Sequence, residues 1–257
     1  AYLLLALAGA HRDRPELWAK CREYTQRAHG LMQKSEDPRG EGFARIGLTL
    51  LDVIQGQTQA IRTQQLENIR ILEQIGATWA LCEAYRMQVT LALFANDEAE
   101  AVRYLKLQTA AAERDEFTTH LHRGYYFLEH YDEELAMRMA EDLLARQRAQ
   151  PGSRLLGTAL HQLGRMCLNR QQHEHATLLL DEAIDYWRNE SGELGHGTAL
   201  QWSLIDRGRA AHFLGDRAMA FRCYDESIAI FAASQYSMGS GFPLLYRGYL
   251  CMEEEDL

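Results

Sequence analysis

Histidine-rich segments are the first places in this sequence where side chains of the right type could bind a metal. Residues 173–175 read His-Glu-His, but a zinc-binding HExxH helix needs its two histidines one turn apart. At a separation of two residues the imidazoles point to different sides of a helix. His120, His122 and His130 form a second group, in which two members are about two turns apart and no third ligand accompanies them. We therefore expect neither a metal nor a cofactor.

Nucleophilic and phosphate-binding arrangements are missing from the sequence as well. It contains no GxSxG elbow, P-loop or GxGxxG motif, and no strand-like segment that could carry one. Ser153 and Ser240 each follow a glycine and suit helix starts, where a hydroxyl caps free backbone N–H groups. Glu133 and Glu134 suit a first helical turn, where carboxylates complement the helix dipole. We predict that the chain is not an enzyme.

The composition predicts helices throughout. Hydrophobic residues make up 47% of the 257-residue chain, which is enough to bury a sizeable core. Ala, Leu, Gln, Glu and Arg dominate, only four prolines occur, and Val and Ile are scarce. Because the abundant residues are strong helix formers and the scarce ones favour strands, we expect an all-α fold.

Charge and cysteine usage narrow the possible partners and the compartment. The formal net charge of −9 argues against direct binding of nucleic acid or of an anionic membrane by this segment. Five cysteines, widely spaced and without a CxxC pair, are typical of reduced core residues rather than of disulfides or a zinc site. We therefore expect a cytoplasmic protein.

A spacing of twelve residues between two small residues recurs along the chain and indicates repeated helix pairs. Gly164 precedes Ala176 and Gly208 precedes Ala220 at this distance, and Gly124 precedes another alanine in the same way. Glycine allows two helices to approach closely, and alanine is its small counterpart on the second helix. Weaker copies extend the series, whose first-helix positions are 9, 47, 89, 124, 164, 208 and 248.

The segment 157–187 resembles a tetratricopeptide repeat (TPR), with Leu160, the pair Leu163-Gly164 and Cys167 at the usual positions of its first helix. The resemblance implies αα-hairpin repeats stacked in a right-handed superhelix, with about six helix pairs plus one helix. Residues 1–10 are interpreted as the first of these helices, truncated at its start. We expect residues 1–257 to form one TPR-like domain, cut from a longer chain.

The repeats are 35 to 44 residues apart, which is longer than the TPR period of about 34. This long-repeat form is similar to the sensor domains of bacterial multidomain regulators, such as the maltose-regulator type of signal-transduction ATPase and LuxR-type activators. The resemblance implies a role in signalling or transcription regulation.

In a TPR array the first helix of each pair lines the concave face. The resemblance therefore implies a ligand-binding surface made of residues that we call the predicted face: Arg86, Tyr125, His161, Arg165, Asn169, Trp202, Arg209, His212 and Tyr249.

Arg165 and Arg209 each follow the glycine of their repeat, so we expect them to lie one above the other on adjacent helices. Two guanidiniums in that position can bind a carboxylate or phosphate through paired hydrogen bonds. The alternative is that they only pair with acidic neighbours such as Asp206. The chaperone-binding TPRs use a Lys/Asn clamp, and this sequence has Asn169 but lacks the lysine and the second asparagine.

We expect a non-catalytic module that binds a protein, a peptide or a small effector as the sensor domain of a bacterial regulator. A free-standing TPR adaptor or chaperone that binds client peptide segments is the alternative. The unfinished last repeat leaves an apolar edge at the C-terminal helix, through which a homodimer could form.

Overall fold

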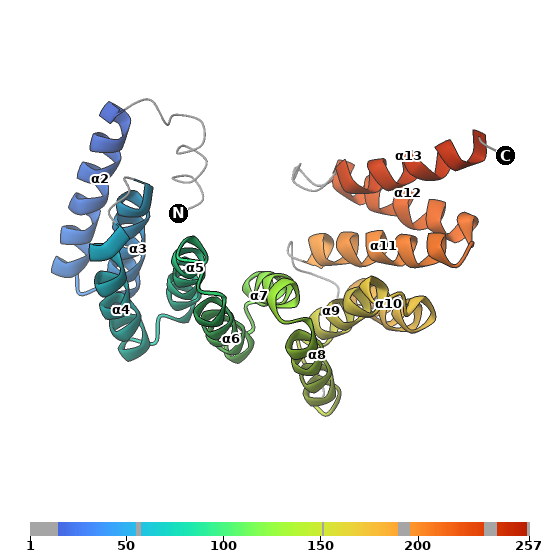
Figure 1. The fold of residues 1–257 in the computed structure, drawn as a ribbon, viewed down its shortest axis with the longest axis horizontal. Helices are drawn as coiled ribbons and strands as arrows, with labels where there is room; N and C mark the ends of the chain where they lie inside the picture. Colours follow the sequence, from blue (N-terminus) through green and yellow to red (C-terminus); the bar gives the residue numbers. More distant parts are fainter. Residues whose placement is uncertain (1–14, 55–57, 151, 190–195, 234–240, 256–257) are drawn as a thin grey trace. The chain divides into compact units, whose positions relative to one another are not determined.

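The computed structural model describes residues 15–54, 58–150, 152–189, 196–233 and 241–255, and every regular element in these ranges is an α-helix (Figure 1). The first six are α2 (Pro15–Lys34), α3 (Pro38–Ile54), α4 (Thr58–Gln74), α5 (Thr78–Phe94), α6 (Glu98–Arg114) and α7 (Thr118–Tyr131). The next six are α8 (Glu133–Arg148), α9 (Leu156–Asn169), α10 (His173–Asn189), α11 (His196–Phe213), α12 (Arg217–Ala233) and α13 (Gly241–Glu255). The predicted all-α fold is confirmed. The helix predicted at residues 1–10 lies outside the described residues.

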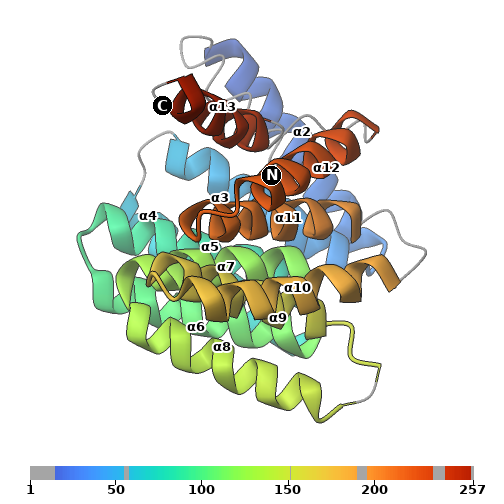
Figure 2. The same ribbon diagram turned by 90° about the vertical axis from the view of Figure 1, so that its right-hand side faces the viewer.

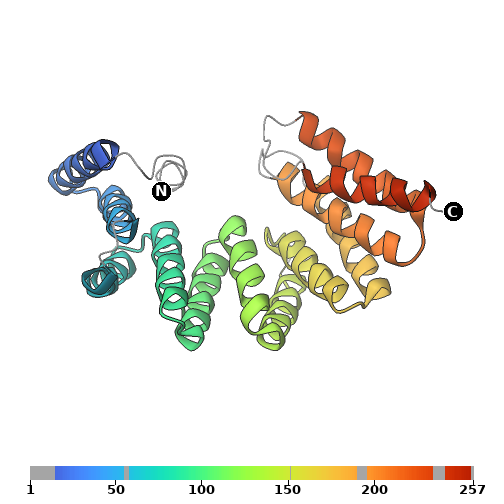
Figure 3. The same ribbon diagram turned by 45° about the horizontal axis from the view of Figure 1, so that its top comes forward.

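The chain forms two compact units, which we call unit 1 (residues 1–132) and unit 2 (residues 133–257). Inside each unit every described helix packs on the next one in sequence, as the hairpins of Figure 3 show. Alternate helices also touch, namely α3 and α5 in unit 1, and α9 with α11 and α11 with α13 in unit 2 (Figures 1 and 2). The first helices of successive pairs therefore lie beside one another. One continuous domain over residues 1–257 stays a prediction.

Six turns in the described part of the chain close in the same way. In each, a backbone N–H donates to the carbonyl five residues earlier, over 2.8–3.1 Å, and the residue before the donor has a positive φ of 52–77°. This is the hydrogen bond of a Schellman motif, which needs a left-handed residue just past the helix end. The left-handed residues are Glu36, Gly76, Asn96, Glu116, Gln171 and Gly215.

Three of these turns also cap the following helix. The carboxylates of Asp37, Asp97 and Asp216 accept hydrogen bonds of 3.0 Å from backbone N–H groups in the first turns of α3, α6 and α12. The starts of α5 and α7 differ, because their N-cap residues Ala77 and Phe117 provide no side-chain cap.

Four of the predicted small-residue positions, 164, 176, 208 and 220, lie in helix contacts. Ala176 and Ala220 are fully buried. A Cβ on Gly164 would come within 2.9 Å of Leu180 Cγ, so this backbone is pressed against its partner helix. Gly248, predicted to open a further repeat, is exposed, and a Cβ there would meet nothing within 4 Å.

Candidate functional site

The predicted face is divided between the two units. Arg86 and Tyr125 belong to unit 1, on α5 and α7. The remaining seven lie in unit 2 on α9, α11 and α13, the helices that touch one another there: His161, Arg165, Asn169, Trp202, Arg209, His212 and Tyr249. The structure thus brings most of the predicted face onto one row of helices in unit 2.

Two members of the predicted face are buried rather than exposed. Tyr125 exposes 1% of its surface and His161 exposes 3%. Both side chains therefore contribute to the core of this structure, and their contact with a ligand stays a prediction. Tyr125 follows Gly124 just as Arg165 and Arg209 follow their glycines, but a tyrosine ring packs down onto the helices where an arginine extends its charged end to solvent.

A buried carboxylate organises the centre of unit 2. Asp206 on α11 exposes 5% of its surface, and its Oδ2 lies 3.0 Å from His161 Nε2 on α9. Its Oδ1 accepts a hydrogen bond of 2.9 Å from Arg209 Nη1. Burial raises the pKa of Asp206, but the hydrogen bond from His161 and the charges of His161, Arg209 and Arg165 outweigh it, so the pKa is lowered. The carboxylate is therefore held in its ionised form.

The two arginines that were predicted to stack both lie in the field of this carboxylate. Arg209 pairs with Asp206 directly, and its guanidinium carbon lies 5.5 Å from the ring centroid of Tyr246 on α13. Arg165 Nη2 donates to Gln162 Oε1 over 3.2 Å. The pairing with Asp206 is thus real for Arg209, and both arginine side chains keep partial exposure to solvent.

Aromatic side chains occur on α11 and α13, within the same row of helices. Trp202 on α11 and Phe242 on α13 have ring centroids 5.4 Å apart. Tyr249 follows on α13 and is 49% exposed. We call Arg165, Trp202, Arg209, Tyr246 and Tyr249 the unit 2 surface. The other two members of the predicted face lie nearby in sequence: Asn169 is exposed at the end of α9, and His212 Nε2 lies 3.0 Å from Glu253 Oε2.

Unit 1 has a buried carboxylate of its own. Glu83 on α5 is fully buried, and its Oε2 accepts a hydrogen bond of 2.8 Å from Arg86 Nε. Its Oε1 lies 3.7 Å from His120 Nδ1 and 3.5 Å from Arg123 Nη1, both on α7. Arg86 therefore contributes to a structural ion-pair cluster, with 18% of its side chain exposed.

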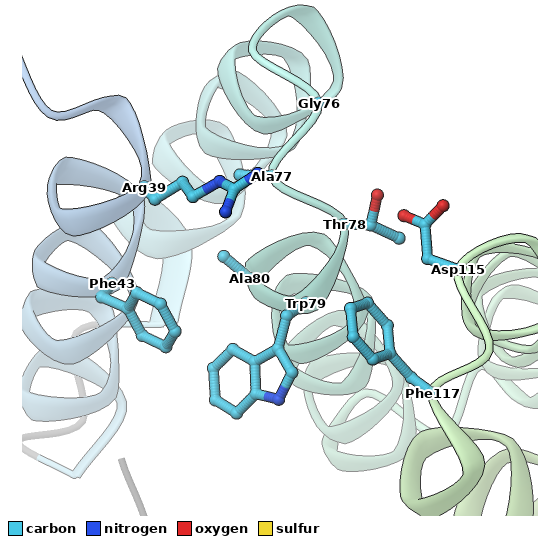
Figure 4. Close-up of a pocket in the computed structure, with 9 residues that line it drawn as sticks. All are labelled: Arg39, Phe43, Gly76, Ala77, Thr78, Trp79, Ala80, Asp115 and Phe117. Atoms are coloured by element: carbon cyan, nitrogen blue, oxygen red, sulfur yellow. The ribbon is translucent and has the colours of Figure 1, made fainter.

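An aromatic cavity adjoins this cluster, at residues that no motif in the sequence singles out. Its volume is about 480 Å³, and we call it the unit 1 cavity. Figure 4 shows Phe43 from α3, Trp79 from α5 and Phe117 from the start of α7 around one space, with Arg39 reaching toward the start of α5. The full lining is Arg39, Phe43, Gly76, Ala77, Thr78, Trp79, Ala80, Asp115 and Phe117.

The aromatic wall is continuous and connects the unit 1 cavity to the buried cluster. Phe43 and Trp79 have ring centroids 4.6 Å apart, and Trp79 meets the edge of His120 at 5.4 Å. Phe117 contacts the same imidazole at 6.2 Å. Phe43, Trp79 and Phe117 stand four, ten and seven residues before the repeat positions 47, 89 and 124, so the predicted register did not group them.

The described ranges contain neither a metal-binding group of side chains nor a membrane-spanning helix. No group of three His, Cys, Asp or Glu side chains there is arranged to hold a metal ion. In the His-Glu-His segment, His173 stacks on Phe213 with centroids 4.8 Å apart, and His175 Nδ1 lies 3.6 Å from Cys167 Sγ. None of the helices described has the length and apolar character needed to cross a bilayer.

Comparison with known proteins concerns the fold. No protein-family model and no curated protein matches the sequence. Among solved structures, BtubC (BKLC) from P. vanneervenii is similar over 84% of this chain and 91% of its own, with a TM-score of 0.58 and 14% identity. A Podosopora anserina protein described as a kinesin light chain with nearly identical TPR-like repeats covers 79% of this chain and 100% of its own, at 18% identity and a TM-score of 0.45. The chain has a TPR-like helical-repeat fold.

Proposed function

We propose that this chain is a non-catalytic interaction module that binds an acidic peptide segment of a partner protein on the unit 2 surface. The observation that carries the proposal is that Arg165 and Arg209, two partly exposed arginines on α9 and α11, both lie in the field of one buried carboxylate, with which Arg209 pairs. TPR-like folds host many different ligands, so the argument rests on this surface rather than on the fold.

The charges of the unit 2 surface favour an anionic partner. Asp206 carries one negative charge, and His161, Arg209 and Arg165 all stabilise it. The guanidiniums of Arg209 and Arg165 both lie in the field of that one carboxylate. Arginine binds carboxylates with paired, charge-assisted hydrogen bonds, and Asp206 holds Arg209 in place before any ligand arrives. A preorganised side chain loses less rotamer entropy on binding.

The aromatic residues supply the apolar contact area. Trp202 on α11 is partly exposed, and Tyr249 on α13 is 49% exposed. Trp, Tyr and Arg are the residue types that most often dominate the free energy of protein interfaces. An acidic segment that also carries apolar residues therefore fits this surface best.

We further propose that the module is the sensor or interaction domain of a bacterial signalling or transcription regulator in the cytoplasm. The one feature that supports this role in a regulator is the spacing of 35 to 44 residues between repeats. The free-standing adaptor uses the same surface, so peptide binding does not separate the two roles. A transcriptional or enzymatic output that changes when the peptide binds, measured with the full-length protein, separates them.

A library of displayed peptides, selected against the purified chain, tests the proposal. We expect enrichment of acidic sequences, and a weakening of about tenfold for the double variant Arg165→Gln and Arg209→Gln. Glutamine keeps a hydrogen-bond donor near Asp206, so folding should be preserved. The matched control is Arg138→Gln with Arg222→Gln, two exposed arginines of unit 2 on α8 and α12.

Tyr249→Ala provides a second variant that does not touch Asp206. We expect it to weaken peptide binding while leaving the melting temperature unchanged. Selection of peptides without acidic residues, or equal affinity for the arginine double variant and its control, contradicts the proposal. Loss of peptide binding at protein concentrations where sedimentation detects a dimer shows instead that α13 pairs with a second copy.

A further inference from the structure

We infer that the unit 1 cavity is a separate binding site for a small aromatic carboxylate. The inference goes beyond peptide binding on unit 2, because it concerns another class of ligand and residues of unit 1 only. Its volume of about 480 Å³ lies in the range of small-molecule pockets, about 300–1,000 Å³.

The walls of the unit 1 cavity select a flat apolar group. Phe43, Trp79 and Phe117 come from three different helices and turn their rings to the same space (Figure 4). Phe43 leaves 48% of its surface exposed beside Trp79, although an aromatic ring at a helix contact usually buries more. A bound ring would cover this surface and stack on or meet the edges of the existing rings.

The charges that line the cavity select an anion. Arg39 makes no ion pair and no side-chain hydrogen bond to any described residue. The one lining carboxylate, Asp115, is already compensated by Arg114, whose Nε lies 3.6 Å from it. Arg114 also donates a hydrogen bond of 3.0 Å to the lining residue Thr78. The guanidinium of Arg39 is therefore the uncompensated charge, and it would repel a cationic ligand.

The backbone adds a second attraction for an anion in the unit 1 cavity. The helices α5 and α7 both begin at it, and their N-cap residues, Ala77 and Phe117, line it without capping the helix by a side chain. The N-terminal N–H groups and the helix dipole stabilise a nearby negative charge. The carboxylate of the ligand would lie between Arg39 and the start of α5, with its ring against Phe43 and Trp79.

The main chain around the unit 1 cavity favours a small molecule over an extended peptide. Two of the tight turns, α4 to α5 and α6 to α7, contribute Gly76, Ala77 and Asp115 to the cavity. Their main chains are fixed by the short-range hydrogen bonds Ala77 N–H to Leu72 O and Phe117 N–H to Ala112 O. These turns therefore line the unit 1 cavity with a fixed main chain.

Titrations with phenylacetate and with its neutral amide, followed by ligand-observed NMR, test this site. We expect saturable binding of phenylacetate that is about tenfold tighter than that of phenylacetamide. Arg39→Gln should remove this preference and leave amide binding unchanged. Phe43→Ala should weaken both ligands, because both lose the same ring contact. Arg27→Gln, an exposed arginine on α2, is the matched control and should behave as the parent protein does.

Several outcomes overturn the inference. These are equal binding of the acid and the amide, no saturable binding of either, or identical behaviour of Arg39→Gln and Arg27→Gln. Binding of a peptide that ends in phenylalanine without binding of free phenylacetate also overturns it, because the site would then recognise a chain terminus. None of these results affects the peptide surface of unit 2, whose variants lie on other helices.

Discussion

The main chain of Gly208 lies directly against the ring of Tyr224, sixteen residues later on the neighbouring helix. A Cβ at position 208 would stand 2.8 Å from the ring carbon Cδ1, and the ring is fully buried, so it has little room to move. Gly164 and Leu180 repeat this relationship at the same separation. The contact defines how closely the two helices of a pair approach.

Gly208→Ala should therefore destabilise the protein. We expect a loss of about 1–3 kcal/mol in the free energy of unfolding, because one added methyl group overpacks the contact with Tyr224. Urea unfolding monitored by circular dichroism measures it. The control is Gly248→Ala on α13, where a Cβ meets nothing within 4 Å and alanine should be neutral or slightly stabilising. Equal losses of unfolding free energy at both positions would contradict the assignment of Gly208, and not Gly248, to a close helix contact.

Asp206 should be more important for stability than an exposed aspartate. Asp206→Ala leaves His161 and Arg209 without their buried partner, and we expect a loss of about 3–5 kcal/mol. Asp225→Ala is the matched control, since Asp225 pairs with Arg247 at the surface and should contribute about 0–1 kcal/mol. Thermal and urea unfolding of the two variants check this. A mild effect at Asp206 would mean that the cluster is solvated.

His120 should make unit 1 sensitive to acid. Burial lowers the pKa of His120 below the ordinary value of 6.5, although the charge of Glu83 acts in the opposite direction and that of Arg86 in the same one. The unfolded chain therefore takes up a proton at a higher pH than the folded chain does. Stability is complete above about pH 6.5 and falls as the pH drops from there toward the lowered pKa.

Urea unfolding at pH 7.5 and 5.5 measures this dependence. His120→Gln should flatten it, since the variant removes the group whose protonation the fold resists. His130→Gln, at an exposed position of α7, should retain the slope. An unchanged slope in His120→Gln would assign the pH dependence to other groups, among which Arg123 and Glu83 lie beside His120.

The left-handed turn residues offer a test that involves no packing. Gln171 has φ 61° and is exposed, so Gln171→Gly should relieve backbone strain and stabilise the protein by about 1 kcal/mol. Gly215→Ala is the reverse experiment, because φ is 77° and a Cβ would meet nothing within 4 Å. It should cost a similar amount in the same unfolding assay. The changes in the free energy of unfolding of the two variants should therefore have opposite signs. Changes of the same sign would refute the turn geometry.

The sequence predicted four positions at which a helix contact depends on the size of one residue. Gly164, Ala176, Gly208 and Ala220 lie in helix contacts because only small residues fit there. The sequence pattern did not predict the burial of Tyr125. This residue follows its repeat glycine as Arg165 and Arg209 do, but the length and polarity of its side chain decided its burial.

The unit 1 cavity was beyond the reach of sequence patterns. Arg39, Phe43 and Trp79 meet there because two tight turns bring the starts of three helices together. Arg39 and Phe43 lie one turn apart on α3, but no helical period links either of them to Trp79 on α5. Likewise, the pairing of His161 with Asp206 spans 45 residues and depends on two first helices lying side by side.

The uniform turns also determine how unit 1 should respond to force. The left-handed residues Gly76, Asn96 and Glu116 are twenty residues apart, so α5 and α6 are equal segments, each closed by its own local hydrogen bonds. Repeat proteins of this kind are held together by contacts between neighbouring segments alone. A chain pulled from its ends should then lengthen in steps of one hairpin and shorten again as each turn re-forms, as an elastic element does.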